Sequence, residues 1–211
     1  MGTTPARLRA DGGVLQLLRW PNVSPRCAAR MWQRNLTLYR RSWTRNVLPS
    51  FFEPLLYLLS IGFGLGLYVG DRILGVDYVV FIAPGLAAAA AMNGAVFEVT
   101  FHVYFKLRYG RLYDAVITTP LEPEDVAAGE LLWAVTRSLI YGTAFLVVMA
   151  ALGYVASPAA LIAPIGFVLV GASFGLVGLI YTTLIPQADL FSYFFTLFVT
   201  PLFLFSGIFF P

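Results

Sequence analysis

The pattern of apolar and polar residues divides most of the chain into long hydrophobic runs separated by short polar segments. A helix needs about 20 apolar residues to cross a bilayer, and it satisfies its own backbone hydrogen bonds there. No charged residue occurs between Arg137 and Asp189. Beyond residue 46, five stretches are long enough, at about residues 47–69, 78–104, 126–153, 159–185 and 190–210. The pattern therefore predicts an all-α polytopic membrane protein with about five transmembrane helices, forming one transmembrane domain over residues 47–211.

The N-terminal region has a different character. Residues 1–23 are mixed in polarity and contain helix breakers, which favours a loosely held cytoplasmic tail. Ser24-Pro25 then predicts the start of a helix over residues 24–46. Its apolar and aromatic residues recur at spacings of three and four, opposite a side rich in arginine: Ala28, Trp32, Leu36, Tyr39 and Trp43 against Arg26, Arg30, Arg34, Arg41 and Arg45. Such an amphipathic helix is suited to the plane of the lipid headgroups.

The placement of basic residues predicts the topology. Nine of the fourteen precede Val47, four lie in the 105–137 segment, and the loop after the first span contains only Arg72. Because Lys and Arg accumulate on the cytoplasmic side, the N-terminus and the 105–137 segment are expected inside, in a multi-pass protein of the cytoplasmic membrane. An arginine cluster can bind nucleic acid, but beside a span it is better explained by topogenic and lipid-phosphate contacts. The lipid bilayer, and no nucleic acid, is the expected partner.

The 105–137 segment is the one strongly polar loop among the apolar runs. Residues 109–117 predict a short amphipathic helix, which Thr118-Thr119-Pro120 ends because the residue before proline avoids the α region. Pro123 and neighbouring carboxylates then predict the start of the next helix. A polar loop between membrane helices favours a docking surface for a partner over a catalytic centre.

A few ionisable residues lie near the predicted cytoplasmic boundary, and such positions are candidates for function. They are Glu53, Glu98, His102, Glu130 and Arg137. Glu98 and His102 are four residues apart and share a helix face. They could form half of a metal site, but the chain has no other histidine, so a buried hydrogen-bonded pair is favoured. Pairing with a basic residue is favoured over substrate contact for Glu53 as well.

Several classes of activity lack their characteristic residues. The sequence contains no glycine-rich phosphate loop, no His-Glu-x-x-His and no Gly-x-Ser-x-Gly motif, and it has a single cysteine, Cys27. The central parts of the spans are apolar, whereas ion-coupled transporters place ionisable groups there. With 59% hydrophobic residues and a mean hydropathy of +0.77, a soluble fold is excluded. The expectation is a non-enzymatic membrane protein without a metal or cofactor.

Four segments in order make the chain resemble the membrane (permease) subunits of type-2 ABC transporters over about residues 25–211. They are FFEPLLYLLSIGFGLG, YVVFIAPGLAAAAAMNGAVFE, KLRYGRLYDAVITTPLEPEDVAAGELLWAVTR and TPLFLFSGIFFP. The resemblance is greatest to the lipo-oligosaccharide (nodulation-factor) export permeases, and daunorubicin-type drug-export permeases are similar. It implies an ATP-driven exporter of an amphipathic substrate, either a lipo-oligosaccharide or polysaccharide or a hydrophobic drug.

The resemblance also implies the partners and the coupling residues. The family has a connecting helix, matching about residues 24–45, and a coupling helix, matching about residues 108–119. The coupling helix docks on a separate ATP-hydrolysing (nucleotide-binding) subunit, and two permease copies, identical or homologous, join two such subunits. The positions of this sequence that match the coupling region of the family, and to which the resemblance assigns this role, are Arg108, Gly110, Arg111, Leu112, Tyr113, Asp114, Ile117 and Pro120.

One departure from the family is expected to matter. Its members have a sixth span, which comes after the SGIFFP motif, and this sequence ends at that motif. The alternative hypotheses are therefore a non-transporting integral-membrane scaffold or binding protein, or an inactive truncated permease.

Overall fold

The computed structural model describes residues 23–41, 78–155 and 157–208, together with Phe52, Leu56, Leu59, Ser60 and Gly64. All regular structure in these residues is helical, which confirms the predicted all-α class. Most of the predicted tail and of the predicted first span, including Glu53, lies outside the described residues. The α-helices are α2 (Pro25–Arg41), α4 (Tyr78–Phe97), α5 (Val103–Arg108), α6 (Leu112–Ile117), α7 (Pro123–Ala151), α8 (Ala163–Leu184), α9 (Phe191–Phe194) and α10 (Thr200–Phe205).

Short helical turns of other types join these elements into longer rods. The π-helical turns are η1 (Glu98–His102) and η4 (Phe195–Val199), and the 3-10 turns are η2 (Pro158–Ile162) and η3 (Ala188–Leu190). Four continuous helical segments in the described part of the chain are long and apolar enough to cross a membrane: Tyr78–Arg108, Pro123–Ala151, Pro158–Leu184 and Ala188–Phe205.

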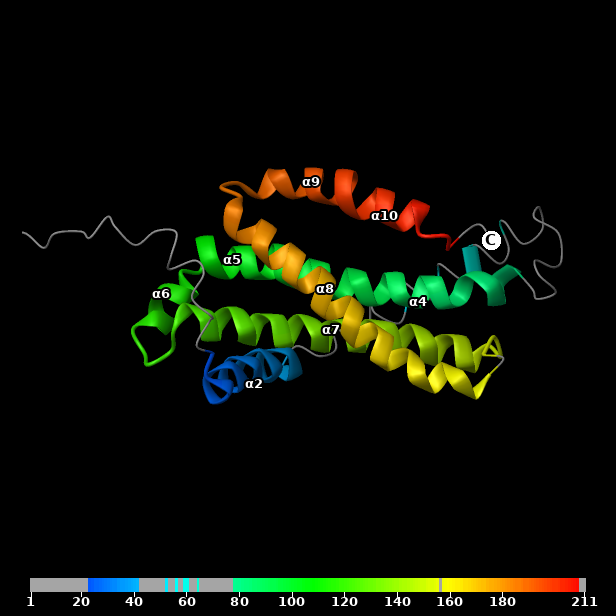
Figure 1. Ribbon diagram of the computed structural model, residues 1–211, viewed down its shortest axis with the longest axis horizontal. Helices are drawn as coiled ribbons and strands as arrows, with labels where there is room; N and C mark the ends of the chain where they lie inside the picture. Colours follow the sequence, from blue (N-terminus) through cyan, green and yellow to red (C-terminus); the bar gives the residue numbers. More distant parts are fainter. Residues whose placement is uncertain are drawn as a thin grey trace, which may run out of the picture.

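Helix α7 is the centre of the assembly. It runs beside the α4–α5 rod along one side, α2 lies along its first half on the other side, and α8 crosses it obliquely (Figure 1). Close approach to α4 requires a residue without a side chain, because a Cβ on Gly94 would lie 2.9 Å from the carbonyl oxygen of Arg137. The α9–α10 rod lies on the other side of α4 and α8 from α7 (Figure 1). Among the described elements, α2, α4 and α8 therefore pack directly on α7 from different sides.

The start of α7 is fixed to the start of α2. Asp125 completes a capping box with Glu122, and its carboxylate accepts the Glu122 N–H at 3.3 Å. The same carboxylate accepts the backbone N–H of Ser24 at 2.7 Å. Carboxylates in the first turn of a helix are favourable because of its dipole, and here one of them caps α7 and holds the beginning of α2.

Helix α2 turns toward α7 a face that overlaps its predicted apolar and aromatic side. Its buried residues are Ala28, Met31 and Asn35, and they face α7. Trp32 is half-buried and donates its indole N–H to the Thr136 hydroxyl at 2.9 Å. Trp43, at the end of the predicted aromatic face, lies outside the described residues. A polar side chain, Asn35, is thus buried beside the predicted apolar and aromatic positions of this helix.

Candidate functional site

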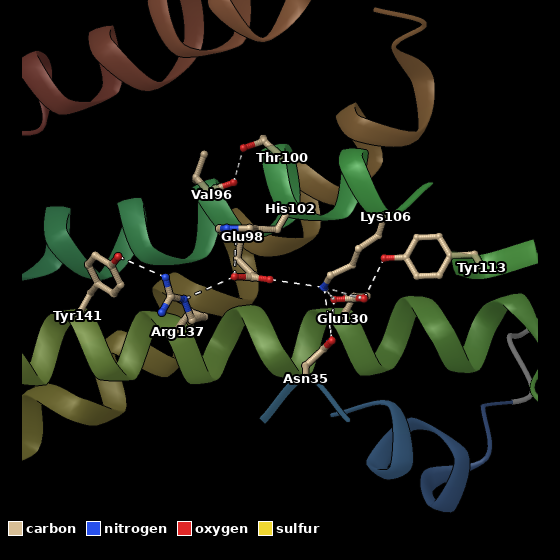
Figure 2. Close-up of polar contacts among 10 residues, drawn as sticks. All are labelled: Asn35, Val96, Glu98, Thr100, His102, Lys106, Tyr113, Glu130, Arg137 and Tyr141. Carbon is tan, nitrogen blue, oxygen red and sulfur yellow. Dashed lines mark hydrogen bonds and ion pairs between the residues drawn. The ribbon is translucent and has the colours of Figure 1, made fainter. Parts of the chain in front are cut away.

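A cluster of polar side chains lies where α2, η1, α5, α6 and α7 converge (Figure 2). We call it the polar cluster, and its ionisable members are two carboxylates, a lysine, an arginine and a histidine. They are Glu98, Glu130, Lys106, Arg137 and His102, joined by Asn35, Tyr113 and Tyr141. Residues from five helical elements therefore share one network of hydrogen bonds and ion pairs.

Glu130 forms one half of this cluster. It is 1% exposed, and its carboxylate accepts hydrogen bonds from three different elements. The donors are Lys106 Nζ on α5 at 2.9 and 3.1 Å, the Tyr113 hydroxyl on α6 at 2.8 Å and Asn35 Nδ2 on α2 at 2.9 Å. Burying a carboxylate is costly unless its lone pairs are satisfied by such donors. Glu130 consequently ties α2, α5 and α6 to α7.

Glu98 forms the other half. It is 5% exposed and lies 3.5 Å from Lys106 Nζ, 3.3 Å from His102 Nδ1 and 3.5 Å from Arg137 Nε. Lys106 therefore lies between the two carboxylates and links them. The four-residue spacing predicts that His102 pairs with Glu98, and the two side chains do so. The side chain of His102 is 57% exposed and forms the solvent-facing edge of this pair.

The π-helical turn η1 sets the directions of these side chains. Such turns contain one more residue per turn than an α-helix, and they occur frequently at functional sites. Thr100, inside η1, donates its hydroxyl to the Val96 carbonyl at 2.7 Å (Figure 2). Glu98, at the start of η1, faces Arg137, and Lys106, about two helical turns further along, reaches both Glu130 and Glu98.

Arg137 lies at the end of the cluster nearest the middle of α7. Its guanidinium carbon is 4.9 Å from the ring centroid of Tyr39 and 4.9 Å from that of Tyr141, distances typical of cation–π contacts. Its Nη2 group donates to the Tyr141 hydroxyl at 3.2 Å. Arg137 is thereby held by aromatic rings as well as by Glu98.

The predicted coupling residues have different environments. Helix α6 spans Leu112–Ile117, shorter than the predicted 108–119, because Arg111 adopts a left-handed conformation with φ of 41° and interrupts the helix before it. Its inward face is held by Tyr113, which is buried with Met31, Val103 and Val126. Gly110, Arg111, Asp114 and Pro120 are exposed, Leu112 is half-buried, and the side chain of Ile117 lies outside the described residues.

Arg108, also a predicted coupling residue, contacts another part of the molecule. Its Nη2 group donates to the Ile185 carbonyl at the end of α8, at 3.3 Å. Burial, together with the charge of Glu130 and the hydrogen bond to it, raises the pKa of Tyr113 above its ordinary value, so this hydroxyl remains a donor. Only part of the predicted docking set therefore forms an open surface, while Tyr113 and Arg108 hold the loop against the helices.

Three members of the cluster were not among the predicted site residues. They are Asn35, Lys106 and Tyr141. Lys106 is four residues after His102, and Tyr141 is four after Arg137, so the spacing within each helix was a usable signal for both. Asn35 has no such local signal, because its carboxylate partner lies on another helix.

Comparison with known proteins identifies the family of this sequence. The sequence model of the "ABC-2 type transporter" family, described as a membrane family, matches residues 28–211. The chain belongs to the ABC-2 type transporter family. It is therefore a multi-pass membrane permease, a non-catalytic transporter subunit, as the resemblance predicts. ABC-2 permeases function with ATPase subunits.

Curated relatives of this ABC-2 permease are named Nodulation protein J. The protein from Sinorhizobium fredii (strain NGR234) is 35% identical over 181 residues, which are 86% of this chain and 69% of the relative. The one from Rhizobium leguminosarum bv. trifolii is 36% identical over the same shares. The protein from Neorhizobium galegae is 29% identical over 195 residues, 92% of this chain and 71% of the relative. No solved structure gives a significant match.

Proposed function

We propose that this permease belongs to an ATP-driven exporter in which a separate ATPase subunit docks on the exposed side of α6. The observation that carries the proposal is the hydrogen bond between the Tyr113 hydroxyl and Glu130 at 2.8 Å. It joins α6 to the polar cluster, which itself reaches α2, η1, α5 and α7. A force applied to α6 would therefore act on several helices together.

The energetics of the cluster support this transmission. Moving α6 away from α7 would remove a donor from a buried carboxylate, and moving α5 would separate the buried Glu130 from its ion-pair partner Lys106. Breaking a buried ion pair costs about 3–5 kcal/mol. This cost exceeds thermal energy severalfold, so α6 and the first half of α7 are expected to move as one unit when the ATPase subunits close.

The proposed substrate is an amphipathic lipo-oligosaccharide or related saccharide. Its support is the resemblance to the lipo-oligosaccharide export permeases and the relatives named Nodulation protein J. A hydrophobic drug is the second substrate class, because the drug-export permeases share the same sequence plan. The complex is proposed to contain a second permease copy, identical or homologous, and to have the N-terminus and α6 on the cytoplasmic side.

The test is affinity purification of the full chain from native membranes in mild detergent, with identification of co-purifying proteins and an ATPase assay. Asp114→Lys reverses the charge of an exposed residue on α6, and we expect it to lose the ATPase subunit and its stimulated turnover. Gln33→Lys is the matched control, because it places the same lysine at an exposed position of α2.

Membrane insertion of both variants should equal that of the unchanged chain. An ATPase subunit that remains bound and stimulated in Asp114→Lys would contradict docking on α6. A chain that purifies without any ATPase subunit would instead favour the scaffold hypothesis.

A further inference from the structure

A cavity of about 280 Å³ lies at the end of the helices opposite α6, between the start of α4, the end of α7 and the start of α8 (Figure 1). Its wall includes the buried side chains of Ala87, Met149 and Phe167, one from each of these three helices. Among the described residues that line the cavity, none is charged. The wall therefore offers no partner for an ion and suits an apolar group.

The cavity is elongated along the helices. On α4 its lining extends from Val80 to Ala87, which corresponds to about 10 Å at 1.5 Å per residue. This part of α4 belongs to a helical segment that is long and apolar enough to cross a membrane. Tyr154 and Ser157, in the turn between α7 and α8, line the cavity at the end where α4 begins, and each has a hydroxyl group. One end of an otherwise apolar space is thus polar.

Pro84 adds a second polar feature to the same wall. A proline has no N–H, so the carbonyl of Val80, four residues earlier, lacks the donor that an α-helix normally supplies. Val80 and Pro84 are one helical turn apart and both line the cavity. Inside a membrane such a carbonyl requires a donor from a neighbouring group. The cavity wall therefore combines apolar side chains with a hydrogen-bond acceptor near its polar end.

These properties favour one kind of occupant. Apolar cavities of about 150 Å³ stay dry and bind apolar molecules such as benzene, so water alone is a poor occupant for the inner part of this larger cavity. The apolar groups that surround a membrane helix are the flexible chains of lipids. A narrow space about 10 Å long fits an extended chain better than a compact ring system. The polar end matches the part of an amphipathic molecule where its chain joins its headgroup.

We propose that this cavity binds one alkyl chain of an amphipathic molecule, with the polar part of that molecule beside Tyr154 and Ser157. A phospholipid of the bilayer and a single-chain glycolipid share this chemistry. The site lies apart from α6 and the polar cluster. Binding is measured on the permease alone, so a negative result here would not affect the proposed docking of the ATPase subunit, and failure of that docking would not affect this site.

The test uses the full chain purified in digitonin, a detergent with a rigid steroid body and no flexible alkyl chain. The probes are dodecyl maltoside, maltose, which lacks the chain, and dioctanoyl phosphatidylglycerol. The measurement is the thermal unfolding midpoint against probe concentration, because a ligand that binds the native state raises it. We expect dodecyl maltoside to raise the midpoint to a plateau and maltose to leave it unchanged. A rise with the phospholipid as well assigns the site to alkyl chains in general, and a rise with dodecyl maltoside only assigns it to single-chain amphiphiles.

Ala160→Phe is the decisive variant, because it places a ring in the cavity from the 3-10 turn η2. A benzene-sized ring occupies a cavity of about 150 Å³, roughly half of the space. We expect the half-saturating concentration of dodecyl maltoside to rise about tenfold or more, since each displaced methylene accounts for about a factor of four. The matched control is Ala159→Phe, which adds the same ring at the neighbouring exposed position of η2, outside the cavity lining. It should respond like the unchanged chain.

Ala163→Leu narrows the cavity from α8 and should change the response in the same direction as Ala160→Phe, so it decides the question if the latter does not fold. The proposal is overturned if neither chain-bearing probe raises the midpoint of the unchanged chain to a plateau. It is equally overturned if the cavity-filling variants and Ala159→Phe respond at the same probe concentrations.

Discussion

The two halves of α7 hold their neighbours by different means. The first half carries the buried charges Glu130 and Arg137, and it binds α2, α5 and α6 through directed hydrogen bonds. In the second half, Phe145 and Met149 belong to an apolar cluster with residues of α4 and Phe167 of α8. At Gly142, the absence of a side chain lets the Phe167 ring approach closely, since a Cβ there would lie 2.6 Å from it. One helix thus combines a polar junction with an apolar one.

The difference shows which contacts fix the relative position of two helices and which contacts only fill the space between them. Lipid tails are as apolar as leucine, so apolar helix contacts in a bilayer depend on close packing rather than on exclusion from water. Such contacts allow small shifts between helices. A buried carboxylate with donors from three elements allows few arrangements, because any shift leaves a charge or a donor unpaired. The polar half therefore fixes the orientation of α6, and the apolar half allows the helices to adjust.

The largest effect is expected from Glu130→Ala. This change leaves the Lys106 ammonium with Glu98 at 3.5 Å as its only carboxylate among the described residues, and it releases Tyr113 and Asn35. Removing one partner of a buried ion pair costs about 3–5 kcal/mol. The free energy of unfolding, measured by denaturant titration in detergent, should fall by that amount.

Glu130→Gln is the matched variant, because its single amide oxygen can still accept hydrogen bonds from some of these donors. It should lose clearly less stability than Glu130→Ala. If Glu130→Ala unfolds at the same denaturant concentration as the unchanged chain, the stability of the contacts around the first half of α7 does not depend on this carboxylate.

The long membrane helices could be predicted from sequence because their signal is an average over many residues. A run without charge between Arg137 and Asp189 permits few alternatives in a polytopic protein. The local pairing of Glu98 with His102 could also be predicted, because both residues lie on one helix at a four-residue spacing. In both cases the information lies within one continuous segment.

The contacts between helices in the polar cluster could not be predicted in this way. The contact of Asn35 with Glu130 depends on how α2 is rotated against α7, and the aromatic pattern does not specify that rotation to within one residue. Likewise, Tyr113 looked like part of the docking surface, whereas the left-handed Arg111 directs α6 so that this ring is buried. Helix rotation and loop conformation decide these contacts, and neither can be read from local periodicity.

A smaller effect is expected from adding a methyl group at the polar junction. A Cβ on Gly129 would lie 2.5 Å from the Cβ of Met31 and 3.0 Å from the Ala28 carbonyl oxygen, so α2 would have to move. Overpacking of this kind costs about 1–3 kcal/mol. Gly129→Ala should therefore lower the free energy of unfolding and also reduce ATPase stimulation, because moving α2 strains the bond between Asn35 and Glu130.

Two further glycines sharpen this comparison. Gly142→Ala overpacks the apolar half against Phe167, and we expect it to lower stability while leaving ATPase stimulation per folded molecule unchanged. Gly166→Ala is the control, since no atom lies within 4 Å of the added Cβ, and the lower helix cost of alanine should stabilise it slightly. Equal loss of stimulation in Gly129→Ala and Gly142→Ala would show that the two halves do not differ in this respect.

Among the destabilising variants, the smallest change in stability is expected from Tyr113→Phe. This variant distinguishes the role of Tyr113 in holding α6 in place from a role in transmitting motion to the polar cluster. The ring keeps its apolar neighbours, and Glu130 keeps Lys106 and Asn35, so only one hydrogen bond to a carboxylate, of about 1.5 kcal/mol, is lost. Because burial raises the pKa of Tyr113 above a value already near 10, the loss should be constant from about pH 6 to about pH 9. If this hydroxyl links α6 to the polar cluster, ATPase stimulation should fall much further than the stability change explains. A decrease in stimulation no greater than the decrease in folded protein would mean that the apolar contacts of α6 are sufficient to transmit the motion.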